Sequence, residues 1–130
     1  MFKKIKFKSF KNKSGELIPV EINKKFPMKV KRFFFIYGKK NYVRADHAHK
    51  RCSQFLYPIF GKIKVKYINK NDKGTKILNY KNKEGFLLKP KNWCKIEFLT
   101  NNAILMVVCD RPYEYEDYIE NYIDFLKYIK

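Results

Sequence analysis

The stretch RADHAHKRCSQFLYPIFG, residues 44–61, contains both histidines of this 130-residue chain. The histidines stand two positions apart, and on a strand such residues point to the same face. His47 and His49 would therefore lie side by side, where two imidazoles can move protons or hold a metal ion. The pattern predicts a functional site on a strand; the alternative is a pair of surface histidines.

Short apolar runs follow one another on both sides of this stretch. After it, Ile63, Val65 and Tyr67 alternate with lysines, which is typical of a strand with one buried face. Pro58 interrupts the run before it and favours a sheet edge or a bulge there. Further strands are expected over residues 2–8, 17–22, 30–37, 54–60, 77–80, 85–88, 93–99 and 103–109. Many short strands at regular spacing predict an all-β sandwich or barrel.

Only the C-terminal segment shows helical periodicity. Within residues 116–129, apolar side chains recur at positions 119, 122, 123, 126 and 129, which is helical spacing. Acids, Asp117 among them, fall in the first turns and lysines near the end, in agreement with the helix dipole. We expect one amphipathic helix that caps the β-barrel.

Length and composition fit a single folded domain over residues 1–130. The chain has a mass of 15.8 kDa, with 45% hydrophobic and 18% aromatic residues, so it has enough apolar surface for a core. Its apolar runs fall short of the roughly 18 residues of a membrane span, and residues 1–10 lack the apolar core of a secretory signal. Three cysteines without a CxxC spacing favour reduced thiols. We therefore expect a cytoplasmic protein without a membrane partner.

The strong positive charge favours an anionic ligand without specifying nucleic acid. The formal net charge is +18, but 26 of the 30 basic residues are lysine, an amino acid with AT-rich codons. A solvated lysine surface explains most of this excess. A nucleic-acid binder is the alternative, but the sequence carries no recognition motif of that class. An anionic small ligand remains compatible with the charge.

The spacing of His47, His49, Gln54 and Gly61 resembles the first motif of the cupin superfamily, which implies a jelly-roll barrel. Metal-binding cupins carry Glu where this chain has Gln54, and a later histidine where Cys94 or Lys95 stands. Two neutral imidazoles and an amide are a poor divalent-metal site. We expect no metal and no cofactor; the alternative is a site with Cys94 as a soft ligand.

A longer series of residues resembles the dTDP-4-oxo-6-deoxy-D-glucose 3,4-ketoisomerase family of sugar-nucleotide cupins over nearly the full length. The matching positions are Lys31-Arg32 with the aromatic run to Tyr37, Arg44 to Lys50, Gln54, Pro90, Trp93, Tyr113 and Asp117-Tyr118-Ile119. The chain departs from the family pattern at Ala45, where family members have glycine. Phe34-Phe35 likewise replaces a tyrosine pair.

The resemblance implies an isomerase that moves the keto group of dTDP-4-oxo-6-deoxy-D-glucose from C4 to C3 through an enediol(ate). The product, a dTDP-3-oxo-6-deoxyhexose, would supply 3-amino or 3-acetamido sugars of surface glycans. His47 and His49 would be the acid and base, with their division of labour left open. The implied substrate-binding residues are Arg32, Tyr37, Arg44, Lys50, Gln54 and Trp93.

The chemistry of each side chain suggests what it would bind. The two arginines and Lys50 suit the diphosphate, and Gln54 would hold a histidine tautomer or a sugar hydroxyl. Tyr37 and Trp93 would pack against sugar or thymine, or else belong to the core. The sequence leaves open the configuration at C4 of the product and the glycan that uses it.

The sequence also leaves two other functions open, and the family resemblance predicts an oligomeric state. The chain could instead be another dTDP-sugar cupin, such as a 3,5-epimerase, or a non-catalytic sugar- or anion-binding cupin. The resemblance also implies a homodimer. The N-terminal strand, residues 2–8, is followed by a flexible segment and would be exchanged between the two subunits.

Overall fold

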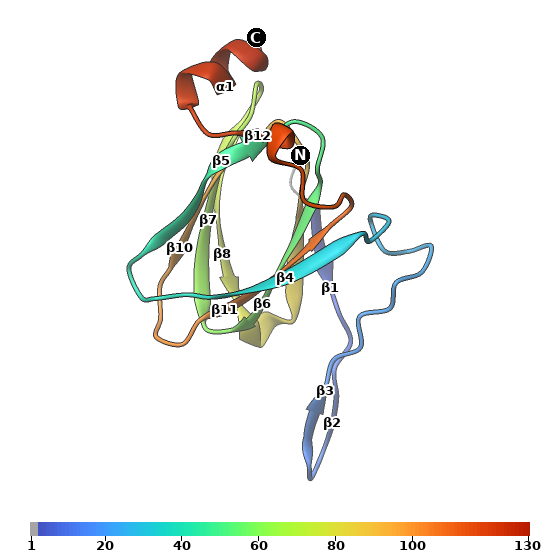
Figure 1. Ribbon diagram of the computed structural model, residues 1–130. Coiled ribbons are helices and arrows are strands. Elements are labelled where there is room, and N and C mark those ends of the chain that lie inside the picture. Colours follow the sequence, from blue (N-terminus) through green and yellow to red (C-terminus); the bar gives the residue numbers. More distant parts are fainter. Residues whose placement is uncertain (1–2) are drawn as a thin grey trace.

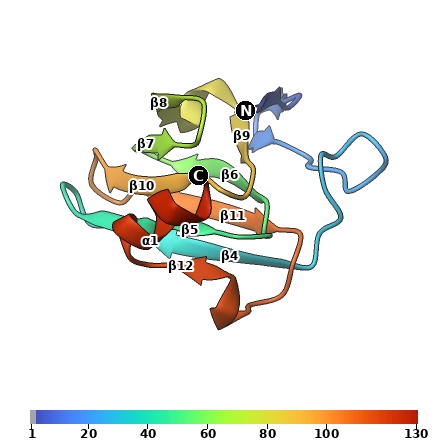
Figure 2. The same ribbon diagram turned by 90° about the horizontal axis from the view of Figure 1, so that it is seen from above.

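The computed structural model describes residues 3–130, whose strands form two facing five-stranded sheets (Figures 1 and 2). The first sheet has the order β1 (Lys3–Lys6), β9 (Glu84–Leu88), β6 (Gln54–Phe60), β11 (Ile104–Cys109) and β4 (Arg32–Tyr37). The second has the order β12 (Tyr118–Ile119), β5 (Val43–His49), β10 (Trp93–Phe98), β7 (Lys62–Ile68) and β8 (Lys73–Asn79). The remaining elements are β2 (Phe10–Asn12), β3 (Gly15–Leu17), the 3₁₀ turns η1 (Tyr80–Asn82) and η2 (Tyr115–Asp117), and helix α1 (Tyr122–Tyr128).

The eight strands from β4 to β11 have the connectivity of a jelly roll. The chain alternates between sheets through β4, β5, β6 and β7, pairs β7 with β8, and alternates again through β9, β10 and β11. The printed pairings are antiparallel, as expected for a double-sheet jelly roll. The expected all-β barrel with a C-terminal helix is confirmed.

The barrel interior is filled by alternate residues of the strands. Ile63, Val65 and Tyr67 of β7 are buried as predicted, and they pack against Ile96 and Phe98 of β10. The bulge expected at Pro58 is present, because Leu105 pairs with Pro58 and Ile104 with Phe60, which leaves Ile59 without a partner in the register. Strand β6 nevertheless lies between β9 and β11, so the sheet accommodates Pro58 by the bulge and not by an edge position.

Each sheet also has a covered outer face. On the first sheet, Phe55, Tyr57 and Val108 are covered by Phe26 and other apolar residues of the N-terminal segment. On the second sheet, Phe125 of α1 packs against Ala48, Trp93 and Ile119 and forms a separate apolar cluster with them. The N-terminal and C-terminal segments thus close opposite sheets of the same barrel.

The predicted helix over residues 116–129 is too long. Helix α1 begins after Asn121, whose side chain accepts a hydrogen bond from the backbone N–H of Asp124 at 3.0 Å. The preceding Tyr118 and Ile119 instead pair with β5 at His49 and Ala48. Strand pairing therefore overrides the helical periodicity and brings this segment to the mouth of the barrel.

The predicted strand over residues 17–22 is wrong. Leu17 ends the short strand β3, which forms a hairpin with β2 around the expected turn near Gly15. Pro19 follows, lacks a backbone N–H donor, and the chain then crosses the first sheet, where Val20 packs on the outer apolar cluster. The β2–β3 hairpin projects away from the barrel (Figure 1).

The N-terminal strand lies at the edge of its own sheet. Strand β1 pairs with β9 from Lys3–Leu87 to Lys6–Glu84. Of the predicted strand over residues 2–8, Phe2 lies outside the described residues. Within residues 3–130, no helix has both the length and the apolar character needed to cross a membrane.

Candidate active site

Strand β5 ends at His49 beside β12 (Figure 1), and because Ala48 packs on the outer face, His47 and His49 on either side of it point into the barrel. Their ring centroids are 5.1 Å apart and the rings are nearly perpendicular, at 84°. Ala48, between them, faces outward and packs under α1. The structure therefore places the two imidazoles side by side on the inner face, as the two-residue spacing predicts.

A bulge in β5 sets the direction of the histidines. The residues before His47, Ala45 and Asp46, both adopt left-handed backbone conformations, with φ of 67° and 60°. The register with β10 shifts at this point, between Cys94 and Lys95. The Asp46 carboxylate accepts a hydrogen bond from Trp93 Nε1 at 3.0 Å on the outer side, which holds the bulge in place.

Asp117 fixes the tautomer of His49. Its Oδ2 lies 2.8 Å from His49 Nδ1, and its two oxygens accept backbone N–H groups of Arg51 and Cys52 at 2.7 and 3.3 Å. Burial opposes ionisation, but these hydrogen bonds outweigh it and lower the pKa of Asp117. Because an ionised carboxylate only accepts hydrogen bonds, the His49 ring proton sits on Nδ1.

The other nitrogen of His49 is left free to act as a base. Its Nε2 is buried and has no hydrogen-bond partner among the described residues. Burial lowers the pKa of His49, with Asp117 acting in the opposite direction. Burial and the neighbouring His49 lower the pKa of His47 to about 4. Both rings are therefore neutral near pH 7, with a lone pair available on His49 Nε2.

Tyr118 and Arg32 complete the surroundings of the histidines. The Tyr118 ring centroid lies 4.9 Å from that of His47 and 4.4 Å from that of His49. Arg32 comes from β4 of the facing sheet; burial raises the pKa of Tyr118, and the nearby Arg32 guanidinium opposes this effect. Arg32 Nε is buried and has no partner within residues 3–130, so this donor is available to a ligand.

Gln54 holds a thiol instead of a histidine. Its Nε2 donates to Cys109 Sγ at 3.6 Å, and Arg32 Nη2 donates to the same sulfur at 3.6 Å. A hydrogen bond from Cys52, together with those from Gln54 and Arg32, lowers the pKa of Cys109 to about 7. Asp117 thus holds the histidine tautomer, which is one of the two roles predicted for Gln54. The other predicted role of Gln54, binding a sugar hydroxyl, stays a prediction.

The other predicted substrate-binding residues lie further from the imidazoles. Lys50 lines a hollow of about 520 Å³ together with Tyr118, and its Nζ lies 5.7 Å from the Tyr128 ring centroid. Arg44 is exposed on β5, three residues before His47. Within residues 3–130, neither cation makes a hydrogen bond or ion pair with His47 or His49.

Tyr37 and Trp93 are not brought to the histidines. Tyr37 is 77% exposed on the outer face of β4. Trp93 is 6% exposed and lies under α1, with its ring centroid 5.2 Å from that of Tyr122 and 5.6 Å from that of Phe125. Of the two roles open to Trp93, the structure places it in core packing.

Among the described residues, one group of side chains could ligate a metal, and it differs from the alternative site that would have used Cys94. One ligand atom each of His49, Cys52 and Asp117 lies within 4.8 Å of the others. Cys94 is buried in the inner core and stands opposite His47 in the register. The site therefore has metal-ligating side chains that sequence analysis did not assign.

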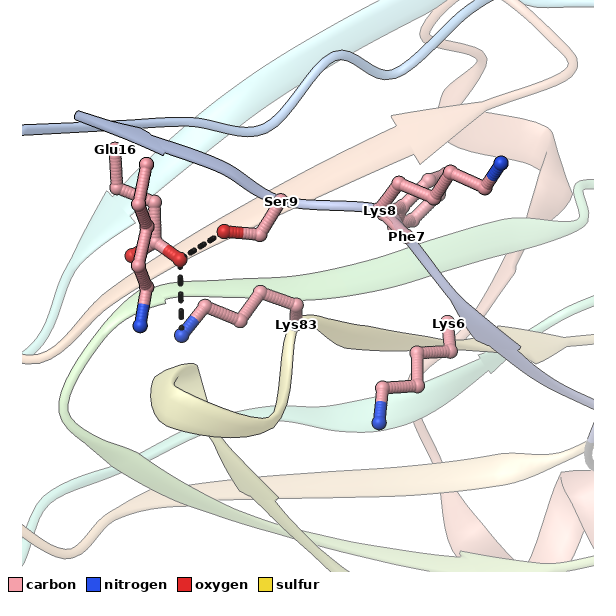
Figure 3. A pocket seen from close by; sticks show the side chains of 7 residues that line it. Lys6, Phe7, Lys8, Ser9, Glu16 and Lys83 are labelled. Carbon is pink, nitrogen blue, oxygen red and sulfur yellow. Dashed lines mark hydrogen bonds and ion pairs between the residues drawn. The ribbon is translucent and has the colours of Figure 1, made fainter.

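A larger hollow lies at the N-terminal strand and carries no acid–base pair of this kind. It has a volume of about 640 Å³ and is lined mainly by lysines around Glu16 (Figure 3). The Glu16 carboxylate accepts a hydrogen bond from Ser9 and lies 3.3 Å from Lys83 Nζ. The Glu16 carboxylate is paired with Lys83, and the lining contains no histidine, so the paired imidazoles are the candidate catalytic centre.

Comparison with known proteins identifies the family. The family described as "FdtA: WxcM-like, C-terminal" matches residues 1–130. The TDP-4-oxo-6-deoxy-alpha-D-glucose-3,4-oxoisomerase of Aneurinibacillus thermoaerophilus is 30% identical over 128 residues, which cover 98% of this chain and 91% of that protein. This chain belongs to the sugar 3,4-ketoisomerase family. It is a cupin-fold isomerase, as the sequence resemblance implies.

Solved structures agree with this assignment. A variant of the 3,4-ketoisomerase QdtA from Thermoanaerobacterium thermosaccharolyticum, in complex with TDP-4-keto-6-deoxyglucose, is 27% identical with a TM-score of 0.90. The match covers 98% of this chain and 93% of that one. The dTDP-6-deoxy-D-glucose-3,5-epimerase RmlC from Legionella pneumophila is 15% identical, with a TM-score of 0.81 over 91% of this chain and 71% of its own, and shares the fold alone.

Proposed function

We propose that this 3,4-ketoisomerase acts on dTDP-4-oxo-6-deoxy-D-glucose and moves its keto group from C4 to C3. The observation that carries the proposal is the Asp117–His49 pair, which leaves a neutral Nε2 beside a second neutral imidazole. The substrate is that of the Aneurinibacillus relative, and the QdtA variant was solved with the corresponding TDP-sugar. The product would be aminated at C3 for the 3-amino or 3-acetamido sugars of surface glycans.

In the proposed mechanism, His49 Nε2 takes the proton from C3. This proton is acidic because C3 lies next to the C4 carbonyl, and its removal gives an enediol(ate). Asp117 stabilises the imidazolium that forms on His49, since the carboxylate remains ionised and hydrogen-bonded to Nδ1. His47 then relays a solvent proton to C4, the proton of the 3-hydroxyl group passes to O4, and His49 releases the C3 proton to solvent, so no proton is gained or lost overall. A positioned acid–base pair contributes about 10²–10⁴-fold to the rate.

The charges around the pair suit an anionic intermediate and an anionic substrate. Arg32 faces the histidines with an unpartnered Nε and is proposed to stabilise the enediolate or a phosphate oxygen. Arg44 and Lys50 stand outside the histidines, in the position proposed for the diphosphate. Gln54 would bind a sugar hydroxyl from the inner side.

Substitution of the histidines tests this function directly. His47→Asn and His49→Asn should each lower turnover of dTDP-4-oxo-6-deoxy-D-glucose by at least about 100-fold without loss of fold. Turnover within a few-fold of wild type in both variants would contradict the assignment. A non-catalytic sugar-binding cupin would show no turnover in the wild type either.

Metal-free catalysis is part of the proposal. Neither the His49–Asp117 pair nor neutral His47 needs a cation for proton transfer. Activity should therefore persist in EDTA. Loss of activity in EDTA, restored by one divalent cation, would contradict a metal-free mechanism.

The proposed working form is a cytoplasmic homodimer of a single cupin domain, residues 1–130. Strand β4 is an edge strand whose outer face exposes Phe33, Phe35 and Tyr37, at 61, 47 and 77%. An exposed aromatic edge of this kind is a typical protein interface. The three cysteines are free thiols, in agreement with a reducing compartment. Exchange of the N-terminal strand remains a prediction, because β1 pairs with its own β9.

A further inference from the structure

Three side chains that can ligate a metal converge at the inner end of the histidine site, and Cys109 neighbours one of them. His49, Cys52 and Asp117 each offer one ligand atom, all within 4.8 Å of one another. The Cys109 thiol neighbours Cys52 and is the main cause that raises the pKa of the Cys52 thiol. The four residues come from β5, the turn after it, η2 and β11, and each is at most 6% exposed.

We propose that His49, Cys52, Cys109 and Asp117 form an inhibitory site for a thiophilic divalent cation such as Zn²⁺. Two sulfurs, an imidazole and a carboxylate are a ligand set that favours Zn²⁺ over Mg²⁺ or Ca²⁺. This set differs from the cupin positions around His47, Gln54 and Cys94, with which it shares only His49. The inference of inhibition rests on the proposed role of His49 as the base.

The charges of the cluster permit a bound cation despite its burial. With both thiols ionised, Zn²⁺, two thiolates, one carboxylate and a neutral imidazole carry one net negative charge. Arg32 Nη2 lies 3.6 Å from Cys109 Sγ and Arg51 Nε lies 3.7 Å from Asp117 Oδ1. These guanidinium groups offset the negative charge, which a buried site requires.

Occupancy would remove the catalytic lone pair. Coordination of the cation by His49 Nδ1 breaks the 2.8 Å hydrogen bond to Asp117 and moves the ring proton to Nε2. The two thiol protons are released to solvent, while Asp117 is already ionised. With its proton on Nε2, His49 can no longer accept the C3 proton, so turnover stops until the cation leaves.

Cobalt binding to the intact protein tests the site without relying on activity. One equivalent of Co²⁺ added to the reduced wild-type protein should give the near-ultraviolet charge-transfer band of cobalt–thiolate bonds. Cys52→Ser should weaken this band, and Cys109→Ser provides a second variant of the same test. The matched control is Cys94→Ser, since Cys94 is also buried in the barrel interior but lies outside the ligand group.

Zinc inhibition of the isomerase completes the experiment. About one equivalent of Zn²⁺ should lower wild-type turnover at least 10-fold, with recovery in EDTA, and Cys52→Ser should raise the half-inhibitory concentration at least 10-fold. Cys94→Ser should respond as the wild type does. A wild-type protein without the cobalt–thiolate band overturns the site, as does a band lost only in Cys94→Ser. A band without inhibition overturns the inhibitory role, and a protein that binds cobalt but never isomerises the sugar contradicts the proposed function alone.

Discussion

Asp117 is the residue that converts a pair of histidines into an oriented base. It accepts hydrogen bonds from His49 Nδ1 and from the backbone N–H groups of Arg51 and Cys52, so its position is fixed from two sides. The buried carboxylate also raises the pKa of His49 against the effect of burial. Asp117 therefore controls both the tautomer and the proton affinity of the base.

Replacing Asp117 by asparagine tests this role through the pH profile. The amide keeps the shape but removes the charge, so Asp117→Asn should lower kcat by roughly 100-fold or more. Because loss of the carboxylate lowers the pKa of His49 further, the acidic limb of kcat/KM should move to lower pH. A variant with reduced activity but an unchanged acidic limb would limit Asp117 to a structural role.

Burial of His47 makes the folding free energy depend on pH. The unfolded imidazole binds a proton near pH 6.5, whereas folded His47 does so only at about 4. Between these pH values the unfolded state therefore binds more protons than the folded state. Proton binding thus favours the unfolded state increasingly as pH falls. The free energy of unfolding should decrease by roughly 3 kcal/mol from this group between pH 6.5 and 4.

Urea unfolding at several pH values measures this dependence. His47→Asn should flatten the decrease between pH 6.5 and 4, while both proteins share the further loss at lower pH, where Asp117 is protonated. An identical slope in wild type and variant would contradict the depressed pKa of His47.

At the level of residues, the sequence predicted the imidazole pair but not its partner. The two-residue spacing on a strand is sufficient to place His47 and His49 together. Asp117 lies 68 residues after His49 in a segment whose periodicity predicts a helix, although the family resemblance includes this residue. Contacts between distant segments are set by the tertiary fold, so local periodicity does not reveal them.

The turn between β6 and β7 shows how one element depends on a single residue. Gly61 ends the histidine motif in the sequence and has a φ of +82°. A Cβ there would lie 2.4 Å from Thr100 Oγ1 and 3.0 Å from the backbone of Ala103, in the turn between β10 and β11. Two loops of the barrel thus meet at a position that only glycine fits.

Gly61→Ala should lower the free energy of unfolding by about 2–4 kcal/mol, from the left-handed backbone and the steric clash together. The matched control is Gly15→Ala in the β2–β3 turn, where φ is +138° but a Cβ would meet no atom within 4 Å. Denaturant midpoints should therefore fall much more for Gly61→Ala. Equal losses in the two variants would show that the contact with Thr100 and Ala103 is unimportant.

Alternation along the strands predicted most elements, and its failures have physical causes. Strand β7 reads directly from its sequence because one face meets the core and the other meets solvent. Residues 118–119 have helical spacing but pair with β5, since the backbone of β5 offers an edge there. Residues 18–22 look like a strand because Val20 and its neighbours cover the outer apolar cluster without pairing.

For the whole molecule, the aromatic edge at β4 predicts association. Sedimentation equilibrium at low micromolar concentration should show twice the chain mass of 15.8 kDa. Phe35→Lys should shift this toward the monomer, whereas Ile77→Lys, an equally exposed position on β8, should leave the dimer intact. Deleting residues 1–9 should weaken the dimer or cause aggregation if the N-terminal strand is exchanged. A fully active wild-type monomer would contradict the homodimer.

In the proposed reaction, one proton leaves C3 of the sugar and one is added at C4. The most direct test is proton NMR of the sugar formed from dTDP-4-oxo-6-deoxy-D-glucose in D₂O, trapped by a 3-aminotransferase. Wild type should form a 3-amino sugar with deuterium at C4 and a retained proton at C5, and His49→Asn should form none. Deuterium at C5, as a 3,5-epimerase would introduce, or an unchanged 4-oxo sugar would contradict the proposed reaction.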